Sequence, residues 1–227
     1  MTSDSVPLLR TLMLLTLISG LVDAVSYLGL GRVFTANMTG NVVVLGFAAA
    51  GAPGFSIPAS LTSLGVFLIG ALCAGMAARR IARRGRLLLL AMATEAILSG
   101  SAATVAFLAS TVASGPDRYV VIGVLAFAMG VRNATVRRMA VPDMTTTVLT
   151  MTLTGLAADS KLAGGTGAGT ARRASAVAAM LIGAIAGAAL YLHLGAGLPP
   201  AVAAVAAAGA ATAFRLSSAP GLLDAAR

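Results

Sequence analysis

The sequence predicts an all-α integral membrane protein with about six transmembrane helices and two short re-entrant or half helices. Three observations carry this prediction: composition, the length of the apolar stretches and a weak internal repeat. Of the 227 residues, 58% are hydrophobic and only 10% are charged, whereas a soluble domain carries roughly 25% charged residues. A chain with so few charges is too apolar to cover itself with a soluble surface, so nearly all of it is expected to lie in a bilayer.

Eight apolar stretches can be recognised, and a helix of ~20 apolar residues is long enough to span a membrane. They run over 8–30, 36–51, 57–78, 87–112, 119–138, 144–158, 174–194 and 198–214. The second and the sixth are short and begin with polar residues. We expect a single membrane domain over residues 1–227.

An internal repeat divides the chain into halves at about 8–112 and 118–215. Gly20-Leu21-Val22-Asp23-Ala24 is echoed 110 positions later by Gly130-Val131-Arg132-Asn133-Ala134. The hydropathy pattern repeats at the same offset, so that the second stretch corresponds to the sixth. Weak internal repeats of this kind are typical of transporter folds.

The distribution of arginine and lysine indicates whether the two short stretches span the membrane or enter and leave it on one side. The strongest basic cluster lies at 79–86, and such clusters favour the cytoplasmic side. If all eight stretches span, several basic residues fall outside; if the short two enter and leave on one side, almost all become cytoplasmic. We therefore expect re-entrant elements near the midplane, inverted halves and cytoplasmic N- and C-termini.

Three charged residues lie well inside the expected spans, away from their ends, namely Asp23, Glu95 and Arg132. Burying a charge at the centre of a membrane helix costs about 2.5–3.5 kcal/mol on insertion scales, so each charge needs a reason. Asp23 and Arg132 lie on stretches related by the repeat, and an ion pair between them is expected; such a pair would also lock helices together. Glu95 has no obvious partner and is a functional candidate, and both carboxylates are candidates for coupling protons.

Polar residues at the starts of the two short stretches are candidates for lining a substrate pathway. They are Asn37, Thr39, Asn41, Thr147, Thr150 and Thr154. Asp143 follows Pro142 and is placed to cap the second short helix. A half-helix that begins inside a membrane offers free N–H groups and a positive dipole end to an anion or polar group. The alternative is that these side chains hydrogen-bond between helices and only hold the fold together.

Several function classes are not expected. The formal charge of +9 does not indicate nucleic-acid binding, because the basic residues lie between apolar stretches, where orientation signals belong. Cys73 is the only cysteine, so no disulfide or thiolate metal site is expected. We expect no cofactor, no metal site and no enzymatic activity, because no set of nucleophile and base is visible.

The stretch from Ser19-Gly20-Leu21-Val22-Asp23 to Asn37-Met38-Thr39-Gly40-Asn41 resembles the signature of the YoaK-like family of bacterial multipass membrane proteins. Val141-Pro142-Asp143-Met144-Thr145 resembles the second block of that family. The resemblance covers nearly the whole chain. It implies a bacterial inner-membrane protein of about six spans, and it implies no substrate, because the family has no assigned function.

We therefore expect a transporter or channel for a small polar or anionic solute, with its pathway between the two re-entrant elements. The alternative is a non-transporting accessory or structural subunit whose polar residues serve helix packing. The lipid bilayer is the expected surrounding. Small residues at 201–213 would permit a homo-oligomer, and the Gly183 and Gly187 pair has a spacing suited to close packing within the bundle or between protomers.

Overall fold

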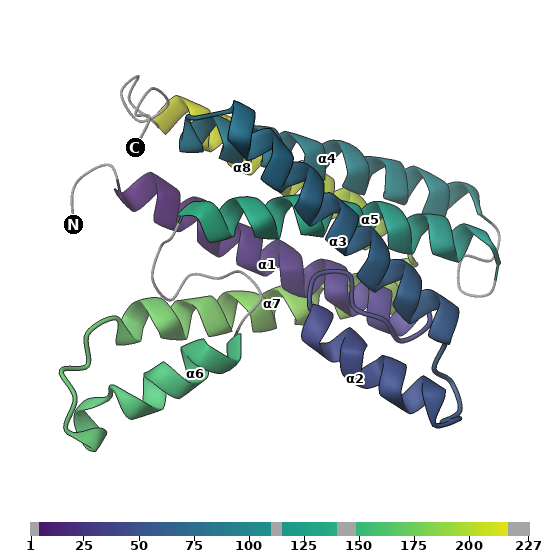
Figure 1. Ribbon diagram of the computed structural model, residues 1–227, viewed down its shortest axis with the longest axis horizontal. Helices are drawn as coiled ribbons and strands as arrows, with labels where there is room; N and C mark the ends of the chain where they lie inside the picture. The colour runs from purple at the N-terminus through teal and green to yellow at the C-terminus, as the bar shows by residue number, and fades with distance from the viewer. Residues whose placement is uncertain (1–4, 110–114, 140–148, 218–227) are drawn as a thin grey trace.

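The computed structural model describes residues 5–109, 115–139 and 149–217, and these are helical apart from short connections (Figure 1). In chain order the helices are α1 (Ser5–Gly29), α2 (Met38–Ala49), α3 (Ile57–Arg80), α4 (Arg84–Leu108), α5 (Asp117–Met139), α6 (Leu149–Ala158), a 3₁₀ turn η1 (Lys161–Ala163), α7 (Thr170–Leu194) and α8 (Leu198–Ser217). Six of them are long and apolar enough to cross a membrane, and α2 and α6 are shorter. The predicted all-α multipass fold is confirmed.

Local sequence explains several helix boundaries. Ser56 caps α3 by accepting a hydrogen bond from the Ala59 N–H (3.3 Å), and Pro58 follows in the first turn. Pro199 and Pro200 occupy the first turn of α8, where a missing N–H costs nothing. After α1 the backbone turns sharply through Gly31 and Arg32, both with positive φ. Arg32 is an unusual residue for that conformation, and this turn starts the connection to α2.

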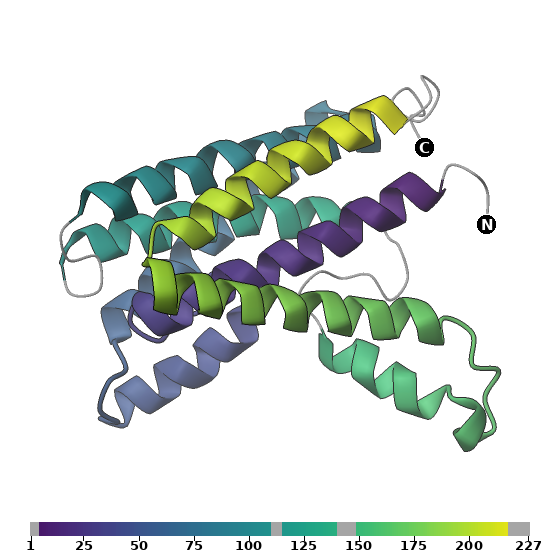
Figure 2. The same ribbon diagram turned by 180° about the vertical axis from the view of Figure 1, so that it is seen from behind.

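The long helices run in two opposite directions (Figures 1 and 2). α1, α4 and α7 run one way, and α3, α5 and α8 run the other. The start of α1, the α3–α4 turn and the end of α8 therefore lie at one end of the molecule. Helices at equivalent places in the two halves of the sequence, such as α1 and α5, are antiparallel.

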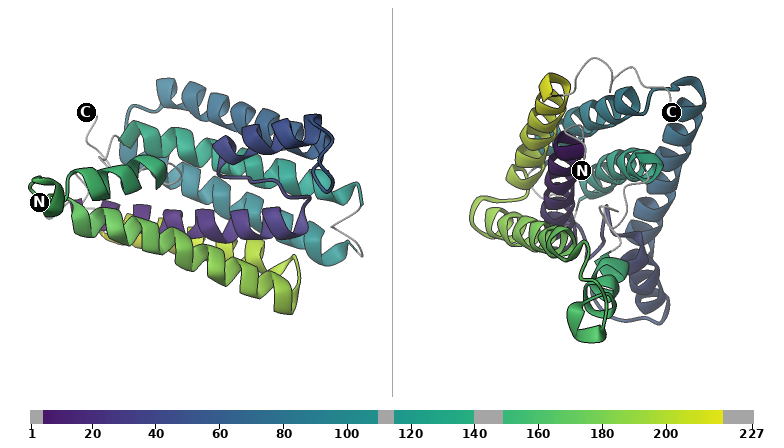
Figure 3. Two further views of the ribbon diagram at one scale, coloured as in Figure 1. Left: turned by 90° about the horizontal axis from the view of Figure 1, so that it is seen from below. Right: turned by 90° about the vertical axis from the view of Figure 1, so that its left-hand side faces the viewer.

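The two central helices are α1 and α5, as the view along the bundle shows (Figure 3, right). In the most apolar 18-residue stretch, 61% of α1 and 56% of α5 is buried, against 17% for both α3 and α7. Large side chains such as Leu15 and Ile18 of α1 and Leu125 of α5 are fully buried between them and their neighbours. α3 and α7 present apolar outer faces, as expected of surfaces that meet lipid.

Each central helix packs tightly against one helix of the other half, α1 against α7 and α5 against α3. A Cβ added to Gly20 would overlap the Met180 carbonyl oxygen, and one added to Gly130 would overlap the Phe67 carbonyl oxygen. Gly183 in turn faces the backbone of Leu17 in the α1–α7 pair. Small residues at these crossings let the helix backbones approach closely, as in other membrane bundles. Gly183 thus serves packing within the bundle.

The short helices lie on the same face of the bundle, one in each half of its length, and each packs against a single helix, α2 on α3 and α6 on α7. Both begin near the middle of the molecule's length and run toward opposite ends (Figures 1 and 2). Their N-terminal ends thus point toward the same central region. This placement brings the polar start of α2 and the first described turn of α6 to mid-depth of the bundle.

Candidate functional site

The break between α1 and α2 is held open by the carboxylate of Asp23. The connection after α1 returns along the helix, and Asp23 Oδ1 accepts hydrogen bonds from the N–H groups of Thr35 (2.9 Å) and Ala36 (2.8 Å). Asp23 is 5% exposed, so these bonds form away from solvent. A buried carboxylate that binds backbone N–H groups fixes a non-helical segment at a depth where its polar groups need partners.

Asn41, in the first turn of α2, binds the same connection from its other side. Its Oδ1 accepts from the Phe34 N–H (2.8 Å), and its Nδ2 donates to the Phe34 carbonyl (2.6 Å). Ser63 of α3 donates to the same carbonyl (2.6 Å) and accepts from Asn41 Nδ2 (3.0 Å). The Asn41 amide is therefore engaged by protein groups. Of the two roles expected for Asn41, helix packing and lining a pathway, these hydrogen bonds correspond to packing.

Arg132 of α5 is completely buried and forms an ion pair with Glu95 of α4. Its Nη1 donates to Glu95 Oε1 at 2.6 Å, and both side chains have no exposed surface. Its Nη2 donates to Ser19 Oγ of α1 at 2.5 Å. The cluster of Ser19, Glu95 and Arg132, which we call the central charge cluster, thus joins three helices at the core of the bundle.

The prediction of an ion pair between Asp23 and Arg132 is wrong, because Arg132 has a different partner. Arg132 binds Glu95, while Asp23 is occupied by the backbone of residues 35 and 36. Asp23 still lies within the electrostatic field of the guanidinium group. The predicted repeat paired the helices that carry Asp23 and Arg132. Arg132 instead binds Glu95, because α4, which carries Glu95, packs along α5.

Several buried atoms of this region have no hydrogen-bond partner. They are Asp23 Oδ2, Glu95 Oε2, Ser99 Oγ and the Nε atom of Arg132. Buried polar atoms in native proteins are nearly always paired with protein groups or ordered water. On three neighbouring helices these atoms leave hydrogen-bonding capacity that a water molecule, a proton or a polar group would satisfy.

At the start of α2, Asn37 occupies the N-cap position but makes no capping bond with its side chain. Asn37 is half-buried and Thr39 is exposed. Asn133 of α5 contacts the connection just before α2, where its Nδ2 donates to the Ala36 carbonyl (3.4 Å). In the predicted repeat Asn133 corresponds to Asp23, and both side chains bind the backbone of the same connection.

In α6 the structure separates the predicted threonines from the core. Thr150 and Thr154 are exposed, and the Thr154 hydroxyl donates to the Thr150 carbonyl (2.9 Å) within the helix. The buried threonine is Thr152, at 3% exposure. The other two predicted residues of this element, Asp143 and Thr147, lie outside the described residues.

The structure thus brings Asp23, Glu95 and Arg132 together in the bundle core, with Asn41 beside the connection that Asp23 holds. Sequence reasoning missed four further polar residues: Ser19, Ser63, Ser99 and Thr152. The sequence did contain an indication for Thr152. It lies 111 positions after the buried Asn41, close to the 110-residue offset of the predicted repeat. Within the chain as described, no three His, Cys, Asp or Glu side chains gather into a metal-binding group.

Comparisons with known proteins agree with this architecture and leave its activity open. The profile of a family described as "Protein of unknown function (DUF1275)" matches residues 11–214. The UPF0700 transmembrane protein YoaK of Bacillus subtilis (strain 168) is 33% identical to this chain over 150 residues, which is 65% of the chain and 65% of that relative. No solved structure matches the chain.

Proposed function

The chain belongs to the DUF1275 family of membrane proteins, and from this premise we propose that it is a transporter or channel for a small polar or anionic solute. The pathway would pass between the N-terminal ends of α2 and α6, beside the central charge cluster. The proposed function is non-enzymatic: the protein moves a solute and does not convert it.

One observation carries this proposal. The two short helices begin in the middle of the bundle and run toward opposite ends (Figure 1). Helix N-termini at mid-depth present N–H groups and a positive dipole end, which favour an anion or a polar neutral group over a bare cation. A membrane protein that only needs to be anchored has no use for two interrupted spans, because every interruption must find partners for its freed backbone groups.

The buried charges support the same proposal. Arg132 and Glu95 are fully buried, and ionisable groups inside membrane bundles are found along solute pathways and proton relays. Glu95 Oε2 and Asp23 Oδ2 have acceptor capacity left over. A proton or a polar solute that entered from either end of the bundle would complete these hydrogen bonds.

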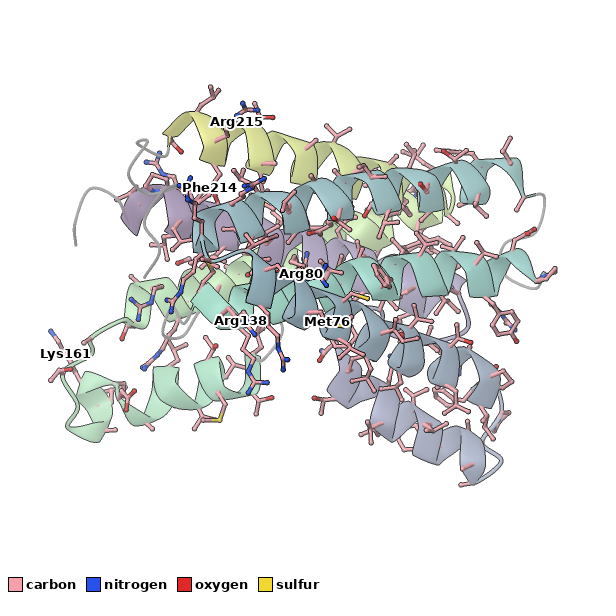
Figure 4. All side chains as sticks on the ribbon, turned by 45° about the horizontal axis from the view of Figure 1, so that its top comes forward. Met76, Arg80, Arg138, Lys161, Phe214 and Arg215 are labelled. Atoms are coloured by element: carbon pink, nitrogen blue, oxygen red, sulfur yellow. The ribbon has the colours of Figure 1, made fainter. Side chains whose placement is uncertain are left out.

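We further propose that the two halves form an inverted repeat with both termini in the cytoplasm of a bacterial cell. Equivalent helices run in opposite directions (Figures 1 and 2), as such a repeat requires. The basic residues also favour this orientation: Arg138, Lys161 and Arg215 lie in the half of the molecule where α1 starts (Figure 4). Positive residues favour the cytoplasmic side.

Site-directed labelling tests the proposed pathway. On a Cys73→Ser background, Asn37→Cys and Thr150→Cys are treated with a membrane-impermeant maleimide in right-side-out and inside-out vesicles. We expect Asn37→Cys to react from the outside and Thr150→Cys from the inside, because α2 and α6 open toward opposite ends. The control is Leu181→Cys on α7, which is 59% exposed and faces lipid, so it should react from neither side. Failure of both test positions to react would contradict a water-accessible centre.

A structural or accessory subunit is the second candidate, and one observation favours it. Asn41 and Ser63 both donate hydrogen bonds to the Phe34 backbone carbonyl. Polar side chains that hold membrane helices together form hydrogen bonds of this kind. Liposome swelling measurements separate the two candidates. A transporter raises the permeability of liposomes to at least one solute of a panel of small anions and neutral polar molecules above that of empty liposomes, whereas a structural subunit raises none.

A further inference from the structure

A groove lies between α4 and α8, at the end of the bundle where α4 begins and α8 ends. It has a volume of about 620 Å³. Its lining residues come from the first turns of α4 and the last turns of α8: Arg86, Leu89, Leu90 and Ala93, and Ala211, Thr212, Arg215 and Leu216. The groove is apart from the central charge cluster, and neither the repeat nor the proposed pathway accounts for it.

Charge and apolar surface are arranged along this groove as they are along a phospholipid. Arg86 is two residues from the start of α4 and Arg215 two residues from the end of α8, so both guanidinium groups lie where long helices leave the membrane. The deeper wall is apolar, and Ala93 lies two helical turns, or ~10 Å, further in than Arg86. Leu90 and Leu216 are exposed, which leaves the wall open to the bilayer.

Among the described residues, no carboxylate neutralises these two arginines. Neither Arg86 nor Arg215 makes a hydrogen bond or an ion pair with another described residue, and four acidic residues are described in all. Asp23 and Glu95 are buried in the centre, Asp117 begins α5 at the opposite end of the bundle, and Asp159 is paired with Arg173. Figure 4 shows Arg215 pointing away from the bundle at its end of α8.

We propose that this groove binds an anionic phospholipid, with the headgroup phosphate between Arg86 and Arg215 and an acyl chain along the apolar wall of α4 and α8. Basic pockets between transmembrane helices are suited to anionic headgroups. Arginine is suited to phosphate because its planar fork donates two parallel hydrogen bonds. The lipid would brace α4, which carries Glu95, against α8.

Native mass spectrometry and thermal melting of the full-length protein in detergent test the proposal. The probes are phosphatidylglycerol, phosphatidylcholine with the same acyl chains, and inorganic phosphate alone. We expect phosphatidylglycerol to bind and to raise the melting temperature, with little effect of the other two. The Arg86→Gln/Arg215→Gln variant should bind phosphatidylglycerol about 10- to 30-fold more weakly.

Two further variants test whether weaker phosphatidylglycerol binding comes from the groove itself or from the loss of surface charge. Arg79→Gln/Arg80→Gln removes the same charge from the last turn of α3, outside the groove, and should bind phosphatidylglycerol within about threefold of wild type. Ala93→Phe fills the apolar wall without changing charge and should weaken lipid binding. All variants should show the wild-type elution profile and lipid-free melting temperature.

Three outcomes would overturn the proposal. Equal binding of the two lipids would remove the role of headgroup charge, and equal losses in both arginine pairs would reduce the effect to general surface charge. Stabilisation by inorganic phosphate equal to that by phosphatidylglycerol would assign the site to a free anion.

Discussion

At the residue scale, the core of this protein is organised by a few polar side chains that do different kinds of work. Asp23 and Asn41 bind the backbone of the connection before α2. Arg132 joins α1, α4 and α5 through Ser19 and Glu95. All of these lie in an environment where an unpaired polar group costs several kcal/mol, so each substitution should report on a specific partner.

Substitutions at Asp23 should separate its structural role from its charge. Asp23→Asn keeps a carbonyl oxygen that accepts from the Thr35 and Ala36 N–H groups, so the melting temperature should stay near wild type. Asp23→Ala leaves both N–H groups buried without an acceptor and should lower the unfolding free energy by about 2–5 kcal/mol. Thermal melting in detergent measures both. A transport role further predicts that Asp23→Asn loses liposome permeability while its fold is kept; normal permeability would make the carboxylate structural.

Glu95 and Arg132 should be strongly coupled. Arg132→Met leaves a buried carboxylate without its partner and should cost about 3–5 kcal/mol of stability. The double variant Glu95→Leu/Arg132→Met removes both charges and should recover most of that loss, because a well-packed apolar pair often replaces a buried ion pair. A double-mutant cycle of melting free energies checks this. Additive losses would contradict the ion pair seen in the structure.

In the proposed mechanism the charge of this pair matters beyond stability. Glu95→Gln retains a carbonyl oxygen for the Arg132 Nη1 group but leaves the buried guanidinium without a counter-charge, so it should lower the melting temperature while the protein still folds. It should abolish solute permeability if Glu95 shapes the field of the pathway or carries a coupling proton. Permeability at the wild-type level in the folded variant would assign Glu95 to packing alone.

At the element scale, the bundle depends on two equivalent helix crossings. α1 meets α7 at Gly20 and Gly183, and α5 meets α3 at Gly130 and Gly70. Gly20 and Gly130 lie 110 positions apart, at the offset of the predicted repeat, and each faces a backbone carbonyl of the neighbouring helix. The short helices follow the same scheme, α2 on α3 and α6 on α7. Their exposed faces, which include Thr150 and Thr154, are not needed for this packing.

Alanine substitutions at the crossings should destabilise the fold. Gly20→Ala and Gly130→Ala each place a methyl group against a backbone carbonyl of the facing helix, so the helices must separate at a cost of about 1–3 kcal/mol. Gly123→Ala on α5 is the matched control, because its Cβ would meet only Val66 at an ordinary 3.9 Å. Melting temperatures should fall for the first two and stay unchanged for the control. A wild-type melting temperature for Gly130→Ala would contradict the close crossing.

At the scale of the whole molecule, the arrangement is a central pair of helices, α1 and α5, surrounded by the other long helices, with the two short ones on one face (Figure 3). The opposite directions of α2 and α6 place the α2–α3 connection at one end of the bundle and the α6–α7 connection at the other (Figure 1). In a bilayer, these two connections should therefore face different compartments.

Accessibility of the two connections checks this orientation. On the Cys73→Ser background, Pro53→Cys should react with an impermeant thiol reagent only from outside the cell, and Leu162→Cys only from the cytoplasm. Both positions are exposed at the ends of the bundle, so solvent reaches them without any motion. Reaction of both from the same side would show that the halves are not inverted.

Much of the fold was determined by the sequence alone. The apolar stretches predicted the six long helices and two short ones to within a few residues, because apolar length is a strong constraint in a membrane. The offset of 110 residues pairs the stretch that forms α1 with the stretch that forms α5, and the repeat itself stays a prediction. Asp23, Glu95 and Arg132 were recognised because charge within a span is costly wherever the chain folds.

Only the tertiary structure decided which of these residues meet. Arg132 takes Glu95 as its partner because α4 packs along α5, while Asp23 turns to the backbone of a connection that folds back on α1. Helical spacing selected Thr150 and Thr154, yet the buried threonine of α6 is Thr152. Periodicity defines a stripe on a helix but not its rotation about its own axis. That rotation is set by contacts with helices distant in the sequence, and partner choice and facing direction therefore became known only from the packed bundle.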